Sequence, residues 1–416
     1  MKNLILLFVI GVIFLFSSCK KDTVSSMAPV QVTTTIPVQT KQITKTDQLK
    51  VASDFIWKTY KDVQITLSGT NNSIVEVAST NNTVYQRAYL AKDLAYNMKL
   101  SVPSYETAIH LLYMGIDTSV NLSSNNIVYT FNSQQVLNSN NHNGQTTITN
   151  NFPCTGYGTL AFEDLWPYKG DYDMNDLVLD YKFVISSNTN NYVEKVVGTF
   201  VIKAFGASLE NGFGFQLPGI ANSSDLTVTG YSLKESFINL NSKGTELGQA
   251  KPTIIVFDNA FKQMASPGGT GVNTDPNQPY VKPVTLTITI DFKPNTYKLN
   301  DLDIANFNPF LIVNKVRGVE VHLPDYAPTS LANTKLLGTG DDNSIQAQNR
   351  YYKTANNLPW AINTYGQFDY PKEKEDISQA YLHFAAWAIS SGHLFSDWYN
   401  DFTGYRNTKL IYQVPQ

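Results

Sequence analysis

The sequence predicts a mainly β protein, in which a β-sandwich-like module precedes a larger domain of β-sandwich or jelly-roll type with a C-terminal helix. Three observations predict this class. Aromatic residues are 12% of the 416-residue chain, mostly Tyr and Phe, which strands favour together with Val, Ile and Thr. Short apolar runs recur at about 8–12-residue intervals, with Gly, Asn, Ser or Pro between them. The apolar spacing becomes helical only near the end of the chain.

The N-terminus predicts an export signal with a lipidation site. Lys2 is followed by the apolar run Leu4–Phe16. At ~1.5 Å per residue this run spans roughly 20 Å, less than the ~30 Å hydrocarbon core of a bilayer. Ser17-Ser18-Cys19 then resembles the lipobox of bacterial lipoproteins, whose cysteine is acylated and becomes the mature N-terminus. We expect residues 1–18 to be a lipoprotein signal peptide and Cys19 to carry lipid; an ordinary secretory signal is the alternative.

The chain after Cys19 predicts a tether followed by a β module. Residues 19–47 are rich in Val, Thr, Ser, Gln and Pro without a sustained apolar pattern, so we expect an extended tether. Residues 48–135 form the β-sandwich-like module. Its expected strands are Asp62–Leu67, Ser73–Val77, Thr83–Tyr89, Tyr96–Val102, Thr107–Met114 and Asn126–Phe131. Residues 136–151 are a polar linker and the predicted domain boundary.

Residues 152–416 are expected to form the larger domain. Its predicted strands are Thr159–Glu163, Leu177–Ser186, Tyr192–Lys203, Leu226–Thr229, Thr253–Val256, Val284–Ile290 and Pro309–Val313. A helix over about 373–391 follows from apolar residues at spacings of four, three and four, which are Ile377, Tyr381, Phe384 and Ala388. With Cys19 lipidated, Cys154 has no disulfide partner, and we expect a packed, inert thiol.

The segment 162–181 is the main candidate site. It holds six acidic residues and one Asn in a chain that is only 16% charged. Asp171, Asp173 and Asn175 alternate, a spacing with which a tight loop turns several oxygens onto one hard cation. All the candidate ligands are oxygens, without a His or Cys cluster, so we expect Ca²⁺. The alternative is a solvated turn, because Asp, Asn and Gly also favour turns.

The loop differs from an EF-hand, since Asp176 stands where the sixth-position Gly would be and Lys182 where the twelfth-position Glu would be. Carboxylates from before the loop are therefore needed. The predicted metal ligands are Glu163, Asp164, Asp171, Asp173, Asn175 and Asp176. Five carboxylates in one turn repel each other unless a cation is present.

Several segments match a known family. They are Phe162–Tyr181, Gly206-Ala207, Asn211–Pro218, Asn308–Phe310, Arg317–Pro324 and Tyr352–Ile362. Together, over about Thr147–Trp398, they resemble the LruC-domain family, envelope proteins and frequently lipoproteins of Bacteroidetes and other Gram-negative bacteria. The acidic segment also resembles calcium loops of other secreted β-sandwich domains. The resemblance implies an envelope location and a β fold without a settled activity.

The function expected from these observations is non-catalytic. We expect an outer-membrane lipoprotein at the cell surface that binds calcium and serves adhesion or binding of a glycan or protein. The alternatives are a structural or assembly component of the envelope and a glycan-acting hydrolase with Glu163 and Asp173 as its acids. The net charge of −3, without a long run of one sign, gives no indication of a nucleic-acid partner. Trp360, Trp387 and Trp398 lie in the aromatic-rich last part of the chain. We expect Trp360 and Trp387 to be core residues, and a sugar-binding aromatic surface is the alternative.

Overall fold

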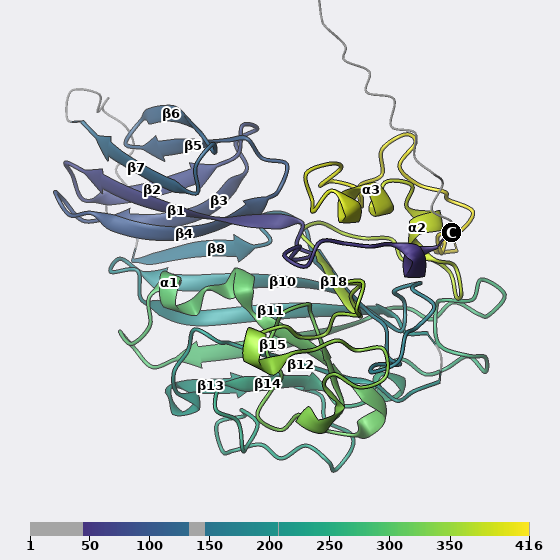
Figure 1. Cartoon of the computed structure of the whole chain (residues 1–416). Helices are drawn as coiled ribbons and strands as arrows, with labels where there is room; N and C mark the ends of the chain where they lie inside the picture. The colour runs from purple at the N-terminus through teal and green to yellow at the C-terminus, as the bar shows by residue number, and fades with distance from the viewer. Residues whose placement is uncertain (1–44, 133–145, 207, 416) are drawn as a thin grey trace, which may run out of the picture. The chain divides into compact units, whose positions relative to one another are not determined.

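The computed structural model describes residues 45–132, 146–206 and 208–415, which all belong to one compact unit. The expected signal peptide, Cys19 and residues 20–44 of the tether lie outside these ranges. The mainly β prediction is confirmed, because strands dominate and the helices are short (Figure 1). No helix within the described ranges is long and apolar enough to span a membrane.

The N-terminal module packs two sheets face to face. One sheet has the order β4 (Tyr96–Pro103), β1 (Tyr60–Gly69), β7 (Asn126–Phe131). The other has the order β3 (Val84–Leu90), β2 (Ser73–Ala78), β5 (Ala108–Tyr113), β6 (Ile116–Asn121). Along most of β1, buried side chains alternate with more exposed ones. The two sheets share one buried apolar cluster that includes Val63, Val75 and Leu111. This is the expected β-sandwich arrangement.

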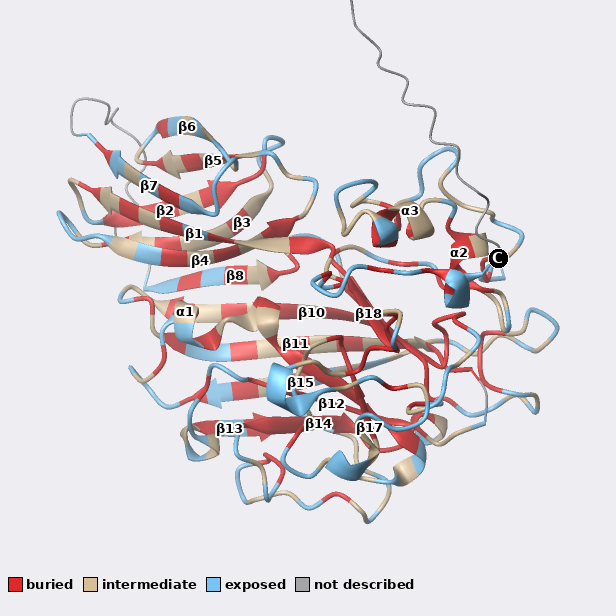
Figure 2. Ribbon diagram, in the orientation of Figure 1, coloured by how far each residue is buried: buried red, intermediate tan, exposed pale blue. Residues whose placement is uncertain are grey.

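The larger part is a second sandwich. Its larger sheet has the order β13-β15-β11-β10-β9-β18, and β8 also pairs with β10. The bounds are β8 Thr147–Phe152, β9 Gly158–Phe162, β10 Leu177–Asn188, β11 Val193–Ala204, β13 Leu226–Thr229, β15 Val284–Phe292 and β18 Ala361–Thr364. The facing sheet has the order β14 (Thr253–Phe257), β12 (Gly212–Gln216), β16 (Asn308–Ile312), β17 (Glu320–His322). Figure 2 shows how completely β12 and β14 are buried.

Short helices occupy the connections. They are the 3-10 helices η1 Thr46–Gln48, η3 Ser223–Asp225, η4 Ala260–Lys262, η5 Ile304–Asn306, η6 Val313–Lys315, η7 Thr334–Leu336 and η8 Gln346–Gln348, and the α-helices α1 Leu299–Leu302, α2 Ile377–Ala380 and α3 Phe384–Ile389.

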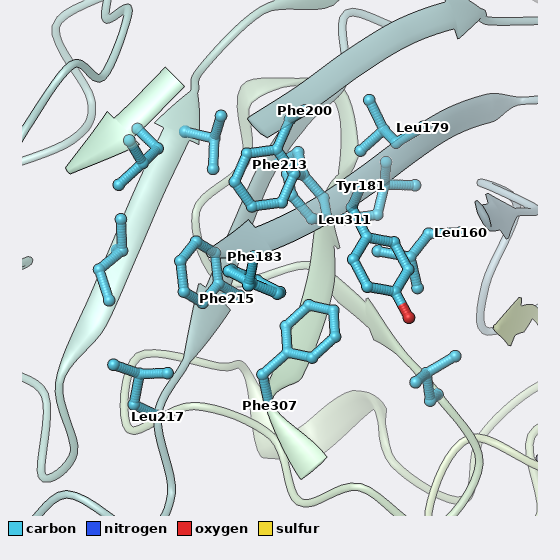
Figure 3. Close-up of a cluster of buried hydrophobic side chains, with 14 of the residues drawn as sticks. Leu160, Leu179, Tyr181, Phe183, Phe200, Phe213, Phe215, Leu217, Phe307 and Leu311 are labelled. Carbon is cyan, nitrogen blue, oxygen red and sulfur yellow. The ribbon is translucent and has the colours of Figure 1, made fainter. Parts of the chain in front are cut away.

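The core of the second sandwich is rich in aromatic rings. Phe183 and Phe200 from the larger sheet meet Phe213 and Phe215 from β12, with Phe307 beside them (Figure 3). The ring centroids of neighbouring pairs lie 5.0–5.9 Å apart, the range of favourable aromatic contacts. The predicted period-2 pattern of β10 puts alternate residues into this core, as expected.

A further apolar cluster covers the opposite side of the larger sheet at β9 and β10. It joins the segment before β1 to residues after β18, with Trp57, Trp387 and Trp398 buried together. The ring centroids of Trp387 lie 5.6 Å from those of Trp57 and 5.4 Å from those of Trp398. Tyr172 and Met174 of the acidic segment belong to the same cluster. The acidic segment is therefore held between two cores.

The structure corrects the predicted C-terminal helix, which is two short helices, α2 and α3. The chain is extended at Tyr381, which has φ −115° and ψ 101°. There Leu382 N donates to Tyr405 O, and Asn407 N donates to Ala380 O at 2.8 Å. Hydrogen bonds to the 405–407 segment thus replace helical ones. The four apolar residues that predicted the helix are nevertheless buried.

Three other expectations change. Thr147–Phe152, at the end of the predicted linker, forms strand β8 and pairs with β10. The expected tether ends before residue 46, since Thr46 is buried and its backbone N donates to Asp376 Oδ2 at 2.7 Å. Strands β6, β12, β17 and β18 are not among the strands predicted from the sequence. Two of these strands have only three or four residues, and β12 contains two glycines, which weaken a strand signal.

Candidate metal centre

The acidic loop connects β9 to β10, and its apolar residues fix its path. Tyr172 and Met174 have positive φ angles of 62° and 53° and are 3% and 0% exposed. Their side chains lie in the cluster that includes the three tryptophans, while Trp166 packs against Tyr352 in the sandwich core, with ring centroids 5.2 Å apart. Left-handed backbone is uncommon for such residues and persists only where packing enforces it.

Hydrogen bonds close the loop at its base. Asp176 N donates to Phe162 O at 3.1 Å, and Glu163 N donates to Trp360 O at 2.8 Å. The indole Nε1 of Trp360 donates to Tyr168 O at 2.8 Å. Trp360 lies next to β18, far away in the sequence. The loop is therefore anchored on both sides by ordered strands.

Three of the six predicted ligands converge. Glu163, Asp171 and Asp173 each place one carboxylate oxygen within 4.8 Å of the other two. Glu163 is 0% exposed and Asp173 is 1% exposed, whereas Asp171 is exposed and lines an opening of about 270 Å³ to the surface. The cluster thus has two buried members and one at its entrance.

Hydrogen bonds orient the two buried carboxylates. Glu163 Oε1 accepts from Met174 N at 2.8 Å, but Glu163 Oε2 has no hydrogen-bond partner among the described residues. Asp173 Oδ1 accepts from Asn175 N at 3.2 Å, and its Oδ2 accepts from Lys374 N at 2.7 Å. A buried carboxylate oxygen without a donor is costly unless a cation contacts it.

Gly170 makes room for this cluster. A Cβ on Gly170 would lie 1.6 Å from Glu163 Oε2. Only glycine therefore allows the carboxylate of Glu163 to lie against this part of the loop. Gly170 is not predictable as part of the site from the sequence, because a Gly before an Asp is also an ordinary turn signal.

The electrostatics of the cluster favour a cation. Burial, and after it the negative charge of Asp171, raises the pKa of Glu163 to about 8. Burial, followed by the charges of Glu163 and Asp171, raises the pKa of Asp173 to about 10. At neutral pH, the folded chain without a cation thus keeps protons on two carboxyl groups that would be ionised if they were exposed to water. A bound divalent cation removes this penalty by stabilising the ionised forms.

The other three predicted ligands are close by but do not join this group. Asp164 Oδ2 accepts from Asn211 Nδ2, and Asp176 Oδ2 accepts from Asp164 N, both at 2.8 Å. Asn175 Nδ2 donates to Pro371 O at 3.1 Å. Asn211, Pro371 and the Lys374 amide were not predicted, because nothing in a single sequence shows which distant segments meet the loop.

Other candidates are structural. His322 is fully buried, with Nε2 2.8 Å from Glu320 Oε2 and Nδ1 2.7 Å from Asn308 Oδ1. Asp342 caps its own turn by accepting from Gly338 N at 2.7 Å. Cys154 is half-buried, and burial raises the pKa of its thiol, which disfavours the reactive thiolate.

The fold and this loop define a class of protein: two stacked-sheet modules with an acidic loop buried at the edge of the larger sandwich. Residues 191–399, beginning just after β10, match the family described as "Domain of unknown function (DUF4842)", and the chain belongs to this family. No curated protein matches this chain.

Among solved structures, the crystal structure named "Putative lipoprotein from Bacteroides ovatus" has a TM-score of 0.57 and 18% sequence identity. The similarity covers 82% of this chain and 100% of that chain. At this identity the similarity shows a shared fold.

Proposed function

We propose that this protein is a lipoprotein of the outer membrane, anchored through Cys19, that binds Ca²⁺ and serves as a non-catalytic binding protein for a glycan or protein at the cell surface. The observation that carries the calcium assignment is the convergence of Glu163, Asp171 and Asp173 around a buried, unpartnered carboxylate oxygen. The name of the Bacteroides ovatus structure agrees with the lipid anchor predicted from Ser17-Ser18-Cys19.

Calcium is the cation that this donor set fits. The group contains three carboxylates and neither imidazole nor thiolate. Calcium accepts ~6–8 oxygen ligands at ~2.3–2.6 Å in flexible geometry, whereas magnesium requires a tighter octahedron. Asp171, at the entrance, leaves room for water to complete the shell.

The burial of the acids supports a non-catalytic role. A glycosidase needs two carboxyl groups facing a sugar from opposite sides of a cleft. Glu163 and Asp173 are almost completely buried. Each carboxylate already accepts a backbone hydrogen bond, Glu163 from Met174 N and Asp173 from Lys374 N. In this arrangement the carboxylates hold a loop in place, and the ligand-binding surface lies elsewhere.

Thermal unfolding of the full-length chain in mild detergent tests the calcium assignment. We expect calcium to raise the unfolding midpoint over that in EDTA, and Asp171→Asn to remove most of the rise. Free calcium at ~10-fold over Kd adds about 1.4 kcal/mol to stability. Asp291→Asn, at an exposed position of β15, is the matched control and should keep the full rise. A midpoint that does not respond to calcium in the wild type refutes the assignment.

Binding assays with and without calcium separate the possible roles. Retention on immobilised polysaccharides, lost in EDTA, supports glycan binding. A stable crosslinked envelope protein without glycan retention supports an assembly role instead. Release of reducing ends that Glu163→Gln abolishes would show a hydrolase and refute the non-catalytic proposal.

A further inference from the structure

A hollow of about 140 Å³ lies where the N-terminal module meets the larger sandwich. The module contributes residues of β3 and of the β2–β3 and β4–β5 turns, and the larger sandwich contributes residues that follow β8, β18 and α3. Thr59 joins the two sides, because its O accepts from Ser104 N at 2.9 Å and its Oγ1 accepts from Tyr365 N at 2.8 Å. The hollow therefore has ordered walls, and such junctions are frequent places for ligands.

Four tyrosines line this hollow, although tyrosine makes up only 24 of the 416 residues. They are Tyr85, Tyr105, Tyr365 and Tyr399. Three of them are at most 7% exposed and form the walls, whereas Tyr105 is 46% exposed. An aromatic ring that stays exposed beside a hollow offers an apolar face to a ligand.

Polar groups with unused hydrogen-bonding capacity lie beside these rings. Glu106 Oε1 accepts from Tyr85 Oη at 2.5 Å, and Glu106 Oε2 has no hydrogen-bond partner among the described residues. Asn81 Oδ1 accepts from Thr83 N at 3.3 Å, which leaves its Nδ2 as a donor. The side-chain amide of Asn400 has no partner within the described ranges. The hollow thus offers a fixed carboxylate oxygen and two amides.

The charge of the hollow excludes an anionic ligand. No described residue that lines it is Lys, Arg or His. Lys61 Nζ donates to Glu106 O at 2.6 Å, but Lys61 is not among the lining residues. An anion would therefore meet the Glu106 carboxylate without a cation in the hollow to offset the repulsion.

Size and polarity together select a small ring that carries hydroxyl groups. A cavity of ~150 Å³ holds benzene, so a hollow of about 140 Å³ has room for one six-membered ring. A purely apolar ring would displace water from the Glu106 carboxylate without replacing its hydrogen bonds, which costs free energy. Hydroxyl groups both donate and accept, so they satisfy the carboxylate and the amides.

We infer that this hollow binds one neutral pyranose residue of a glycan, with the sugar ring against Tyr105 and a hydroxyl group donating to Glu106 Oε2. The inference deepens the proposed function and rests on it, because it takes a glycan as the ligand. None of the residues of the acidic loop lines the hollow. The loop therefore has a structural role, and the ligand lies at the junction of the two sandwiches.

Titration of the full-length chain with methyl glycosides tests the inference. The chain is kept with calcium in a detergent that has no sugar headgroup, and binding is followed by saturation-transfer NMR. The neutral probes are the methyl glycosides of glucose, galactose and mannose, and the charged probes are methyl glucuronide and glucosamine. Titration to about 50 mM covers the Kd of about 1 mM that typical binding energies per ligand atom give. We expect a neutral probe to bind in this range and methyl glucuronide to bind at least about 10-fold more weakly.

Two variants at the surface locate the site. Glu106→Gln removes the charge of the acceptor, and Tyr105→Ala removes the exposed ring. Each should weaken binding about 10-fold, which is the loss expected for one hydrogen bond to a charged group or one comparable contact. Tyr231→Ala, 38% exposed and outside the hollow, and Glu194→Gln, at an exposed position of β11, are the matched controls and should bind as the wild type does.

The outcomes separate this inference from the proposed function. Unchanged binding in both Glu106→Gln and Tyr105→Ala overturns the site. Equal binding of methyl glucuronide, or binding of glucosamine alone, overturns the assignment to a neutral sugar. This comparison uses the wild type, so a variant that fails to fold does not leave the inference untested. If no probe binds, the inference fails, and retention on immobilised polysaccharides still supports the proposed function. Absence of that retention as well removes the glycan from the proposed function.

Discussion

Replacing Glu163 with Gln should stabilise the calcium-free protein and remove most of the effect of calcium on stability. The carboxyl group is completely buried and its pKa is raised to about 8, from 4.5. Below pH 4.5 it is protonated in both states. Above pH 4.5 the unfolded chain releases a proton that the folded chain keeps until about pH 8, so the calcium-free protein loses stability across this window. Glutamine has no such proton, and it keeps the oxygen that accepts from Met174 N.

The size of the effect follows from this shift. Each pH unit in the window costs about 1.4 kcal/mol, so the penalty of Glu163 at pH 7 is at most about 3 kcal/mol. Coupling to Asp173 shares this penalty between two groups, and we expect Glu163→Gln to gain about 1–3 kcal/mol in EDTA. In calcium at ~100-fold over Kd, the wild type gains about 2.7 kcal/mol that the variant lacks.

The assay is urea unfolding at pH 5 and pH 8, in EDTA and in calcium. We expect the variant to be more stable than the wild type in EDTA at pH 8 and to respond little to calcium. Glu194→Gln should behave as the wild type. A Glu163→Gln protein that is destabilised in EDTA and still gains fully from calcium would refute this account of the loop.

Three further predictions concern other residues of the fold. Gly170→Ala should abolish the calcium-induced rise of the unfolding midpoint, because its Cβ displaces the carboxylate of Glu163. Asp376→Ala should lose about 1–2 kcal/mol in urea unfolding and expose the chain near Thr46 to protease, because Asp376 caps α2 and holds that residue. Burial lowers the pKa of His322 below 6.5, so in saturating calcium the wild type should lose stability as pH falls below 6.5, and His322→Gln should flatten that slope.

Matched variants make these predictions testable. Gly318→Ala meets its nearest atom at 3.4 Å and should keep the calcium response. Asp54→Ala, at an exposed position, should keep both stability and protease resistance. An unchanged calcium response in Gly170→Ala contradicts the steric argument. A His322→Gln slope as steep as that of the wild type assigns the acid sensitivity to other groups.

Local patterns were enough to predict much of the fold. Strand β10 follows directly from the alternation of Leu177, Leu179, Tyr181, Phe183 and Ile185, because a strand with one face in a core needs that period. The boundaries of β2, β7 and β13 also agree closely with the predicted ranges. The apolar spacing at the C-terminus predicted the buried face correctly but not the break at Tyr381. That break depends on hydrogen bonds to residues 405–407, which no local pattern contains.

The sequence by itself determined that the candidate oxygen ligands gather in one loop, since the acidic residues and Asn175 are close in the chain. Only the tertiary structure decided which of these side-chain oxygens lie close to one another. Packing of Tyr172 and Met174 sets the loop's path and turns Asp171 and Asp173 toward Glu163. The fold also brings the distant Asn211 to Asp164. Which oxygens share a centre depends on the direction of each side chain, and that is fixed by contacts between segments hundreds of residues apart.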